Sequence, residues 1–305
     1  MEFSLENNMK TLKLPNGNTM PFIGLGTSNL GESEEDLLRI LNLSLDVGYR
    51  LFDTANGYNN EAVIGRFIRN LPIKRSEVFI SSKLNDDAHS YNASLEAVEK
   101  TLYRLNTEYI DLFLVHNPNS QMMRMSCSVL YAADPNYWIA ANQETWLALE
   151  ECYKKGLIKN IGVSNFEERH LSALVRNASV LPAVNQIRYC IGCYKTQKNL
   201  ITYCASKSVL VQAYSPFGKG NALRDRNIIC LAKEKSCSPE LLILSYLNKC
   251  NIPAVIRASS KAHLTNNLSQ MYVSLDEKDM SLIEAITVDE NWAKIKNPET
   301  GEKYN

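Results

Sequence analysis

Short, almost continuously apolar segments alternate with longer amphipathic segments along most of the chain, and this alternation constrains the fold more than any other feature. The apolar segments resemble strands that are buried on both faces of a parallel sheet. The longer segments carry apolar residues at three- and four-residue steps, which predicts helices packed on that sheet. The eight strand candidates are residues 22–27, 50–53, 78–83, 110–116, 159–163, 183–187, 209–213 and 253–257.

Helices are predicted between these strands. In residues 34–46, for example, Leu37, Leu41 and Leu45 share one face. Eight βα units without a linker-like stretch between them predict one (β/α)8 TIM barrel, and we expect residues 1–305 to form a single domain. The other helix candidates are residues 92–105, 143–155, 167–175 and 239–249, and the longest segment that we expect to be irregular is 118–140.

The start of the chain has a different pattern. Residues 11–14 and 19–27 are typical of short strands, and the turn between them contains an Asn-Gly pair. We therefore predict an N-terminal β-hairpin, which would close the bottom of the barrel.

Composition argues against several classes of protein. The 33 Lys and Arg residues balance 33 Asp and Glu residues, so general electrostatic binding to nucleic acid or to acidic membranes is not expected. No apolar run reaches the ~18 residues that predict a membrane-spanning helix, and residues 1–10 lack the apolar core of a secretion signal. We expect a cytoplasmic protein, a monomer or weak dimer, with eight cysteines that remain thiols.

Polar residues follow the second, third and fourth predicted strands, at the ends where a barrel of this kind has its active site. Asp53 ends the second strand and Tyr58 follows it, while Lys83 ends the third strand and His116 the fourth. A phenol has an ordinary pKa of about 10, which a nearby ammonium lowers, and a carboxylate can hold that ammonium in place. With the imidazole to orient a substrate oxygen, these catalytic candidates could reduce a carbonyl group beside a hydride donor.

The later strand ends offer groups that could bind such a donor. Ser164, Asn165 and Gln186 could hydrogen-bond a carboxamide, and Tyr214 offers an aromatic face for a flat ring. After the last strand, hydroxyls and cations at the start of a helix form a candidate phosphate pocket: Arg257, Ser259, Ser260, Lys261 and His263.

From about residue 11 to residue 267 the chain resembles the aldo-keto reductase superfamily. The motif Asp-Thr-Ala-x-x-Tyr-x-Asn-Glu-x-x-x-Gly runs from Asp53 to Gly65, and Gly-Val-Ser-Asn-Phe, Asn-Gln-Ile and Ala-Tyr-Ser-Pro follow in order. The resemblance implies reduction of aldehydes or ketones with NADPH. It implies that Tyr58 is the general acid, that Lys83 and Asp53 tune it, and that His116 orients the carbonyl.

The resemblance also implies roles in cofactor binding. Ser164, Asn165 and Gln186 would hold the nicotinamide carboxamide, Tyr214 would stack on the ring, and Asn267 matches an adenine-contacting residue. The complete set of cofactor-binding candidates is Gly26, Thr27, Asp53, Ser164, Asn165, Gln186, Tyr214, Ser215, Phe217, Arg257, Ser259, His263 and Asn267.

Some residues depart from the family pattern near the phosphates. Arg257 stands where the family has a Lys that binds the 2′-phosphate, and His263 stands where Arg is usual. Because Arg257 keeps a permanent charge, we predict a preference for NADPH, with NADH as a possible second cofactor.

Residues expected on the substrate side also depart from the family pattern. Ser28 and Asn117 stand where the family often has Trp, which predicts a wider or more polar pocket for the carbonyl substrate. Three further candidates could fill that pocket from the loops: Tyr137, Trp138 and Trp292. A polar pocket would also suit sugars or keto-sugar acids. A non-enzymatic NADP(H)-sensing subunit is an alternative, since the resemblance extends to cofactor-binding subunits of membrane channels.

Cys190 and Cys193 have the spacing of a redox or metal motif. The sequence contains no second pair of this kind, so we expect ordinary thiols and predict no metal site. Arg188, in a segment where the family usually reads Glu-Tyr-His-Pro, has no role that the sequence suggests.

Overall fold

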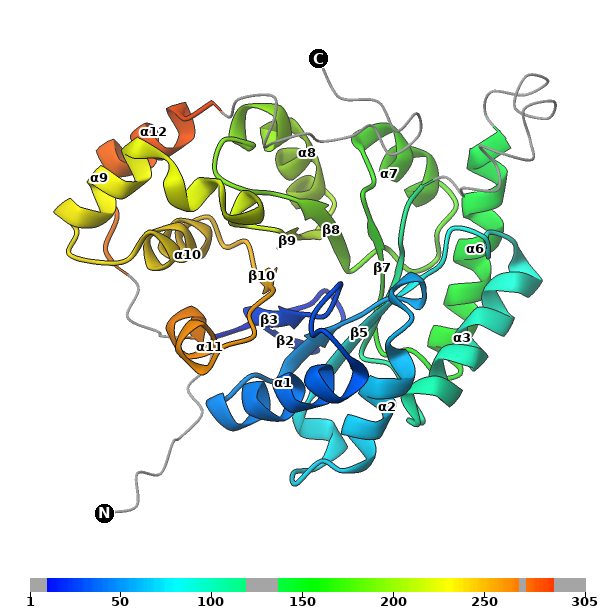
Figure 1. Ribbon diagram of the computed structural model, residues 1–305. Coiled ribbons are helices and arrows are strands. Elements are labelled where there is room, and N and C mark those ends of the chain that lie inside the picture. Colours follow the sequence, from blue (N-terminus) through cyan, green and yellow to red (C-terminus); the bar gives the residue numbers. More distant parts are fainter. Residues whose placement is uncertain (1–9, 119–136, 269–272, 288–305) are drawn as a thin grey trace.

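The computed structural model describes residues 10–118, 137–268 and 273–287. In this part of the chain, eight parallel strands close into a barrel in the order β3 to β10, with β10 paired to β3. Helices surround the strands on the outside (Figure 1). The predicted (β/α)8 barrel is confirmed.

The barrel strands are short, and each overlaps one of the predicted segments with ends that differ by a residue or two. Their bounds are β3 (Ile23–Gly26), β4 (Leu51–Asp53), β5 (Phe79–Leu84), β6 (Leu112–Val115), β7 (Ile161–Ser164), β8 (Val184–Arg188), β9 (Leu210–Tyr214) and β10 (Ala254–Ile256).

Successive residues of a barrel strand point alternately into the barrel and toward the helices. On β4, Leu51 packs inside the barrel with Leu112 and Val184, whereas Phe52 belongs to the layer between strands and helices. Leu51 also fills the space beside Gly24, where an added Cβ would lie 2.1 Å from Leu51 Cδ2. The lower barrel is therefore packed with apolar side chains, and polar groups are left to its upper end.

Capping interactions of ordinary kinds mark the ends of the helices. In α1, for example, Ser33 accepts a hydrogen bond from the Asp36 N–H at the first turn, and Gly48 ends the helix with a φ of 118°. The helices are α1 (Glu34–Val47), α2 (Glu61–Arg69), α3 (Tyr91–Leu105), α6 (Tyr137–Lys154), α7 (Glu168–Val175), α8 (Tyr194–Ser206), α9 (Arg226–Glu234), α10 (Pro239–Lys249), α11 (Lys261–Leu268) and α12 (Glu277–Ala285). Short 3-10 helices lie at Asn56–Tyr58, Arg75–Glu77, Gly218–Gly220 and Ala222–Arg224.

The predicted hairpin is present as β1 (Thr11–Lys13) and β2 (Thr19–Pro21), which pair in antiparallel fashion. Leu14 and Met20 belong to the apolar cluster inside the lower barrel. Asn16 Nδ2 donates to the carbonyl of Lys159, just before β7, at 3.0 Å. The hairpin thus covers the amino-terminal ends of the strands, as predicted.

Helix α6 begins earlier than predicted. We expected residues 118–140 to be irregular and a helix from residue 143, but α6 already starts at Tyr137. This earlier start is stabilised by tertiary packing, because Trp138 and Ala141 are buried in a cluster that also includes Ala173 of α7. Residues 119–136 lie outside the described part of the chain.

None of the helices within the described residues is both long enough and apolar enough to cross a membrane.

Candidate active site

A buried ion pair lies at the upper end of the barrel, where β4 and β5 end. Lys83 Nζ donates to Asp53 Oδ2 at 2.7 Å and to the carbonyl of Thr54 at 2.9 Å. The same ammonium donates to Tyr58 Oη at 3.4 Å. Burial would lower the pKa of Lys83, but the Asp53 carboxylate and the Tyr58 hydroxyl outweigh it and hold that pKa above its usual value. The ammonium therefore stays charged directly beneath the phenol.

Strand register brings these groups together. Asp53 of β4 pairs with Ser81 of β5, and Lys83 lies two residues further along the same face of β5. Asp53 Oδ1 accepts from Ser81 Oγ at 2.7 Å and from Gln186 Nε2 at 2.9 Å. Since both carboxylate oxygens are engaged, Asp53 acts as an anchor for Lys83.

A second buried carboxylate holds the segment that carries Tyr58. Glu61 is 2% exposed and accepts from Asn56 Nδ2 at 2.9 Å and from Ser82 Oγ at 2.6 Å. Arg104 of α3 donates to it at 2.7 Å. Glu61 therefore connects the 3-10 helix that ends at Tyr58 to β5 and α3. Glu61 is part of the sequence motif, but the motif does not show which groups this carboxylate contacts.

His116 follows β6 directly and faces Tyr58. The two ring centroids lie 5.8 Å apart with the rings at 78°. Burial, the charge of Lys83 and the nearby His89 lower the pKa of His116 to about 3. The imidazole is thus neutral near pH 7, with one nitrogen that donates a hydrogen bond and one that accepts.

The four residues predicted to bind a nicotinamide lie together at the ends of β7, β8 and β9. Ser164 Oγ donates to the carbonyl of Gln186 at 2.8 Å, and Tyr214 Oη donates to Asn165 Oδ1 at 2.9 Å. The Gln186 side chain lies inside the barrel, where its Nε2 donates to Asp53 and to Gln212 Oε1 at 2.9 Å each. Gln212 was not among the sequence candidates, although it lies on the same inward face as Tyr214.

The predicted phosphate-binding residues are exposed around the start of α11. Arg257 Nη1 lies 3.5 Å from the carbonyl of Ser28 and 3.4 Å from that of Asn29, so it spans from β10 to the loop after β3. Ser259, Ser260, Lys261 and His263 are exposed beside it, whereas Asn267 is buried one turn further along the helix.

The remaining cofactor-binding candidates line the same end of the barrel. An added Cβ on Gly26 would lie 3.9 Å from backbone atoms of Val255 and Ile256, which is ordinary van der Waals contact, so Gly26 packs beside β10. Thr27 is fully buried, and its Oγ1 donates to the carbonyl of Asp53 at 2.9 Å. Ser215, with a φ of 53°, and the half-buried Phe217 continue the chain after Tyr214.

The substrate-pocket candidates differ in what surrounds them. Asn117 is half-buried and donates to Asp86 at 2.8 and 3.0 Å, a partner that the sequence analysis did not single out. Trp138 packs edge-on against His170 of α7, with ring centroids 4.9 Å apart. Ser28 is half-buried. The Tyr137 side chain and Trp292 lie outside the described residues, and a pocket role for all five remains a prediction.

Outside this centre, one pair of cysteines has the spacing of a redox or metal motif. The Sγ atoms of Cys190 and Cys193 lie 3.1 Å apart, and both thiols are buried at the end of β8. Over the described ranges, no group of three or more His, Cys, Asp or Glu side chains could hold a metal ion.

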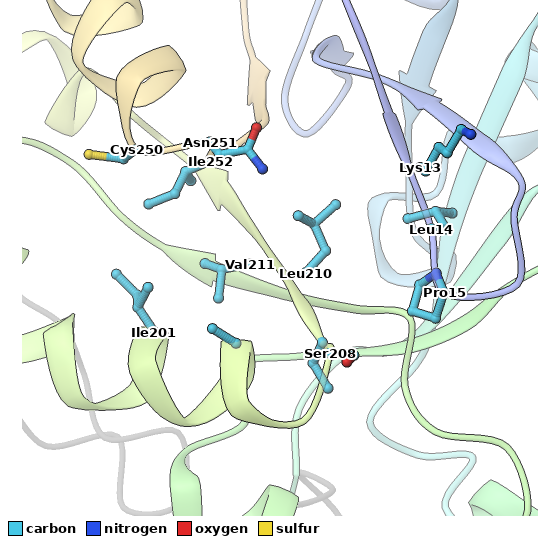
Figure 2. Close-up of a pocket in the computed structure, with 12 residues that line it drawn as sticks. Lys13, Leu14, Pro15, Ile201, Ser208, Leu210, Val211, Cys250, Asn251 and Ile252 are labelled. Atoms are coloured by element: carbon cyan, nitrogen blue, oxygen red, sulfur yellow. The ribbon is translucent and has the colours of Figure 1, made fainter.

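An apolar pocket of about 360 Å³ lies at the opposite end of the barrel, between the hairpin, α8 and the start of β9 (Figure 2). It is lined mainly by side chains such as Leu14, Ile201, Leu210 and Ile252. Its lining contains none of the proton-transfer groups described above.

The fold and this site together define a class of protein: a barrel enzyme with a buried lysine beneath a tyrosine, next to a neutral histidine and a candidate dinucleotide site. Comparison with known proteins gives the family. A sequence profile described as "Aldo/keto reductase family" matches residues 22–288. The chain belongs to this family, and it is therefore an oxidoreductase.

Several known proteins are similar over nearly their whole length. Glyoxal reductase of Bacillus subtilis is 31% identical over 280 residues, which cover 92% of this chain and 94% of that protein. Methylglyoxal reductase DkgA of Escherichia coli O157:H7 is 30% identical over 278 residues, covering 90% and 93%. The crystal structure of a Gox0644 mutant in complex with NADPH superposes with a TM-score of 0.81 at 28% identity, covering 96% and 99%.

Proposed function

We propose that the protein reduces aldehydes or ketones to alcohols with NADPH, and that Tyr58 is the general acid. The observation that carries this proposal is the Lys83 ammonium, which is buried, paired with Asp53 and placed 3.4 Å from Tyr58 Oη. The similarity to a structure that contains NADPH supports the choice of cofactor.

The chemistry of the described residues fits such a cofactor. The exposed Arg257, the serines and His263 at the start of α11 would hold the phosphate on the adenosine side. Ser164, Asn165 and the half-buried Tyr214 would hold the nicotinamide. Bound there, NADPH supplies the hydride that reduces the carbonyl carbon.

The protein's own groups handle the proton and the developing charge. His116, kept neutral by burial, would donate an N–H hydrogen bond to the carbonyl oxygen and orient it. Tyr58 would give its proton to that oxygen. The adjacent ammonium of Lys83 stabilises the negative charge left on Tyr58, and Asp53 keeps the ammonium in position.

Small dicarbonyl compounds are the first substrates to consider. Two relatives are named glyoxal reductase and methylglyoxal reductase. Polyhydroxy substrates are less well supported, because the amide of Asn117, one of the two polar residues expected in the pocket, already bonds to Asp86 and Asn165.

A substrate panel tests the proposed function. Glyoxal, methylglyoxal, an aldose and a keto-sugar acid should be assayed for consumption of NADPH and of NADH. We expect multiple turnovers with the dicarbonyls and a higher kcat/KM with NADPH. Oxidation of no more than one equivalent of NADPH with every compound would instead support the sensor alternative, and a higher kcat/KM with NADH would contradict the cofactor assignment.

A further inference from the structure

Four hydrogen-bonded side chains form a chain across the upper end of the barrel. Asp86 follows β5, Asn117 follows β6, Asn165 follows β7 and Tyr214 ends β9. Asn117 Nδ2 donates to the two oxygens of Asp86 at 2.8 and 3.0 Å. Asn165 Nδ2 donates to Asn117 Oδ1 at 3.0 Å, and Tyr214 Oη donates to Asn165 Oδ1 at 2.9 Å.

The hydrogen bonds that join these four side chains can point in only one direction. An ionised carboxylate accepts hydrogen bonds and cannot donate them, so Asn117 must turn its NH2 group toward Asp86 and its oxygen toward Asn165. That oxygen requires the NH2 group of Asn165, which also donates to the carbonyl of His116 at 3.0 Å. The amide oxygen of Asn165 is thereby left on the side of Tyr214. Turning either amide over would place like groups against each other.

The backbone of Asn165 adds to this restraint. Its φ of 60° is in the left-handed region, which asparagine tolerates better than most residues, and its N–H donates to the carbonyl of Gln186 at 3.1 Å. With the backbone and the NH2 group both held, the amide oxygen is the part of Asn165 that retains bonding capacity. An amide oxygen can accept two hydrogen bonds, and Tyr214 uses one of them.

We propose that Asp86 is a positioning residue that acts through Asn117, and that it fixes Asn165 with its amide oxygen as the acceptor for the NH2 of the nicotinamide carboxamide. This inference rests on the proposed function, which places the nicotinamide beside Asn165. The site then selects a carboxamide over a group of the same shape that has no NH2. Asn117 stands where the family often has Trp. The connection from Asp86 to Asn165 therefore depends on a residue that is particular to this protein.

The test compares two dinucleotides that differ at this group. NADP+ carries the carboxamide, whereas 3-acetylpyridine adenine dinucleotide phosphate carries a methyl ketone without NH2. Their Kd values should be measured by calorimetry for the wild-type protein, Asp86→Ala and Asn117→Leu. The matched control is Asp87→Ala, which removes the neighbouring exposed carboxylate. This carboxylate accepts from Asn85 and does not belong to the four hydrogen-bonded side chains.

We expect the wild-type protein and Asp87→Ala to bind NADP+ about tenfold more tightly than the analogue, as the loss of one hydrogen bond implies. In Asp86→Ala and Asn117→Leu the preference should fall to about twofold or less, because the Asn165 amide is less restrained. Binding of 2′,5′-ADP, which lacks the nicotinamide, should be equal in all four proteins.

An undiminished preference in Asp86→Ala and Asn117→Leu overturns the inference, as does a wild-type protein that binds both dinucleotides equally. Failure of the cofactor assignment, the part of the proposed function on which the inference rests, has a different signature. In that case the wild-type protein would bind neither dinucleotide nor 2′,5′-ADP, and the inference would fall with it.

Discussion

At the scale of single residues, the buried charged groups of the candidate site are held by hydrogen bonds from within the protein. Asp53 accepts from Lys83, Ser81 and Gln186, so its charge is committed to holding the lysine. The Lys83 ammonium is shared among Asp53, the carbonyl of Thr54 and the hydroxyl of Tyr58. Tyr58 is half-buried and is the member of this group that combines an exchangeable proton with access to the surface.

This arrangement predicts the effect of Tyr58→Phe. The variant keeps the ring beside Lys83 but lacks the hydroxyl proton, so kcat should fall by at least about 100-fold, the usual contribution of a general acid. The Kd of NADPH, measured by calorimetry, should stay within about twofold of the wild-type value, since the hydroxyl is not expected to touch the cofactor. Turnover close to the wild-type rate would rule out Tyr58 as the acid.

Prediction from the sequence succeeded at this scale for the positions of residues and for the contacts of Lys83 with Asp53 and Tyr58, but it missed other hydrogen-bond partners. The quartet of Asp53, Tyr58, Lys83 and His116 follows strand ends, and parallel strands in a barrel bring their ends together. The side chain of Gln186 instead turns toward Asp53, and Asp86 pairs with Asn117, because those contacts depend on side-chain direction.

At the scale of elements, the predicted barrel strands and helices agree with the structure to within two residues at every end except the start of α6. Each buried strand is bounded by polar or turn-forming residues, which mark its limits in the sequence. The start of α6 depends on Trp138, which packs against His170 of a helix that comes later in the chain. A local pattern does not contain such a contact, so Trp138 is expected in a loop from the sequence but lies in α6.

The packing of Trp138 leads to a stability prediction. Trp138 is 7% exposed, so Trp138→Ala should lower the free energy of unfolding by about 3 kcal/mol, as for other large-to-small changes in a core. Urea denaturation measures this change. The control is Leu147→Ala on the same helix, where the side chain is 52% exposed and the expected change is within about 0.5 kcal/mol.

The same variant separates packing from substrate binding. If Trp138 acts only in packing, KM for methylglyoxal in Trp138→Ala stays within about twofold of the wild-type value at a temperature where the variant is folded. A tenfold rise in KM with little loss of stability would instead support the predicted role in the substrate pocket.

At the scale of the whole molecule, the polar network at the upper barrel is carried by a large apolar structure. The inner cluster below it and the larger outer cluster between strands and helices exclude water from both sides of the sheet. In such surroundings charged histidines are unfavourable. Burial lowers the pKa of His89 to about 4, and it outweighs the opposing effects of a hydrogen bond with Asn142 and of the Asp87 carboxylate.

These buried histidines predict how stability depends on pH. The pKa of His116 is lowered to about 3 and that of His89 to about 4, so the unfolded chain binds more protons than the folded one below an unfolded-state pKa of about 6.5. The free energy of unfolding should keep its full value above that pH and should decrease as the pH falls below it. At pH 5 each histidine should account for a loss of up to about 2 kcal/mol.

Urea denaturation at pH 7.5 and pH 5 measures this loss. His89→Phe should remove about half of the difference between the two pH values, since one of two buried titrating groups is gone. His263→Gln, a change at an exposed position of α11, serves as the control and should keep the wild-type difference. Equal stability of the wild-type protein at both pH values would contradict the prediction.

The sequence by itself determined the architecture and the location of the candidate catalytic centre. Strand and helix periodicity are local properties, and the closure of eight βα units then brings Asp53, Lys83 and His116 to one end of the barrel. The tertiary structure alone decided which groups bond to one another: the enclosure of Asp53 by Ser81 and Gln186, the early start of α6, and the one-way chain from Asp86 to Tyr214. These features join residues far apart in the chain, and the direction of a hydrogen bond depends on donors and acceptors that only the folded molecule brings within reach.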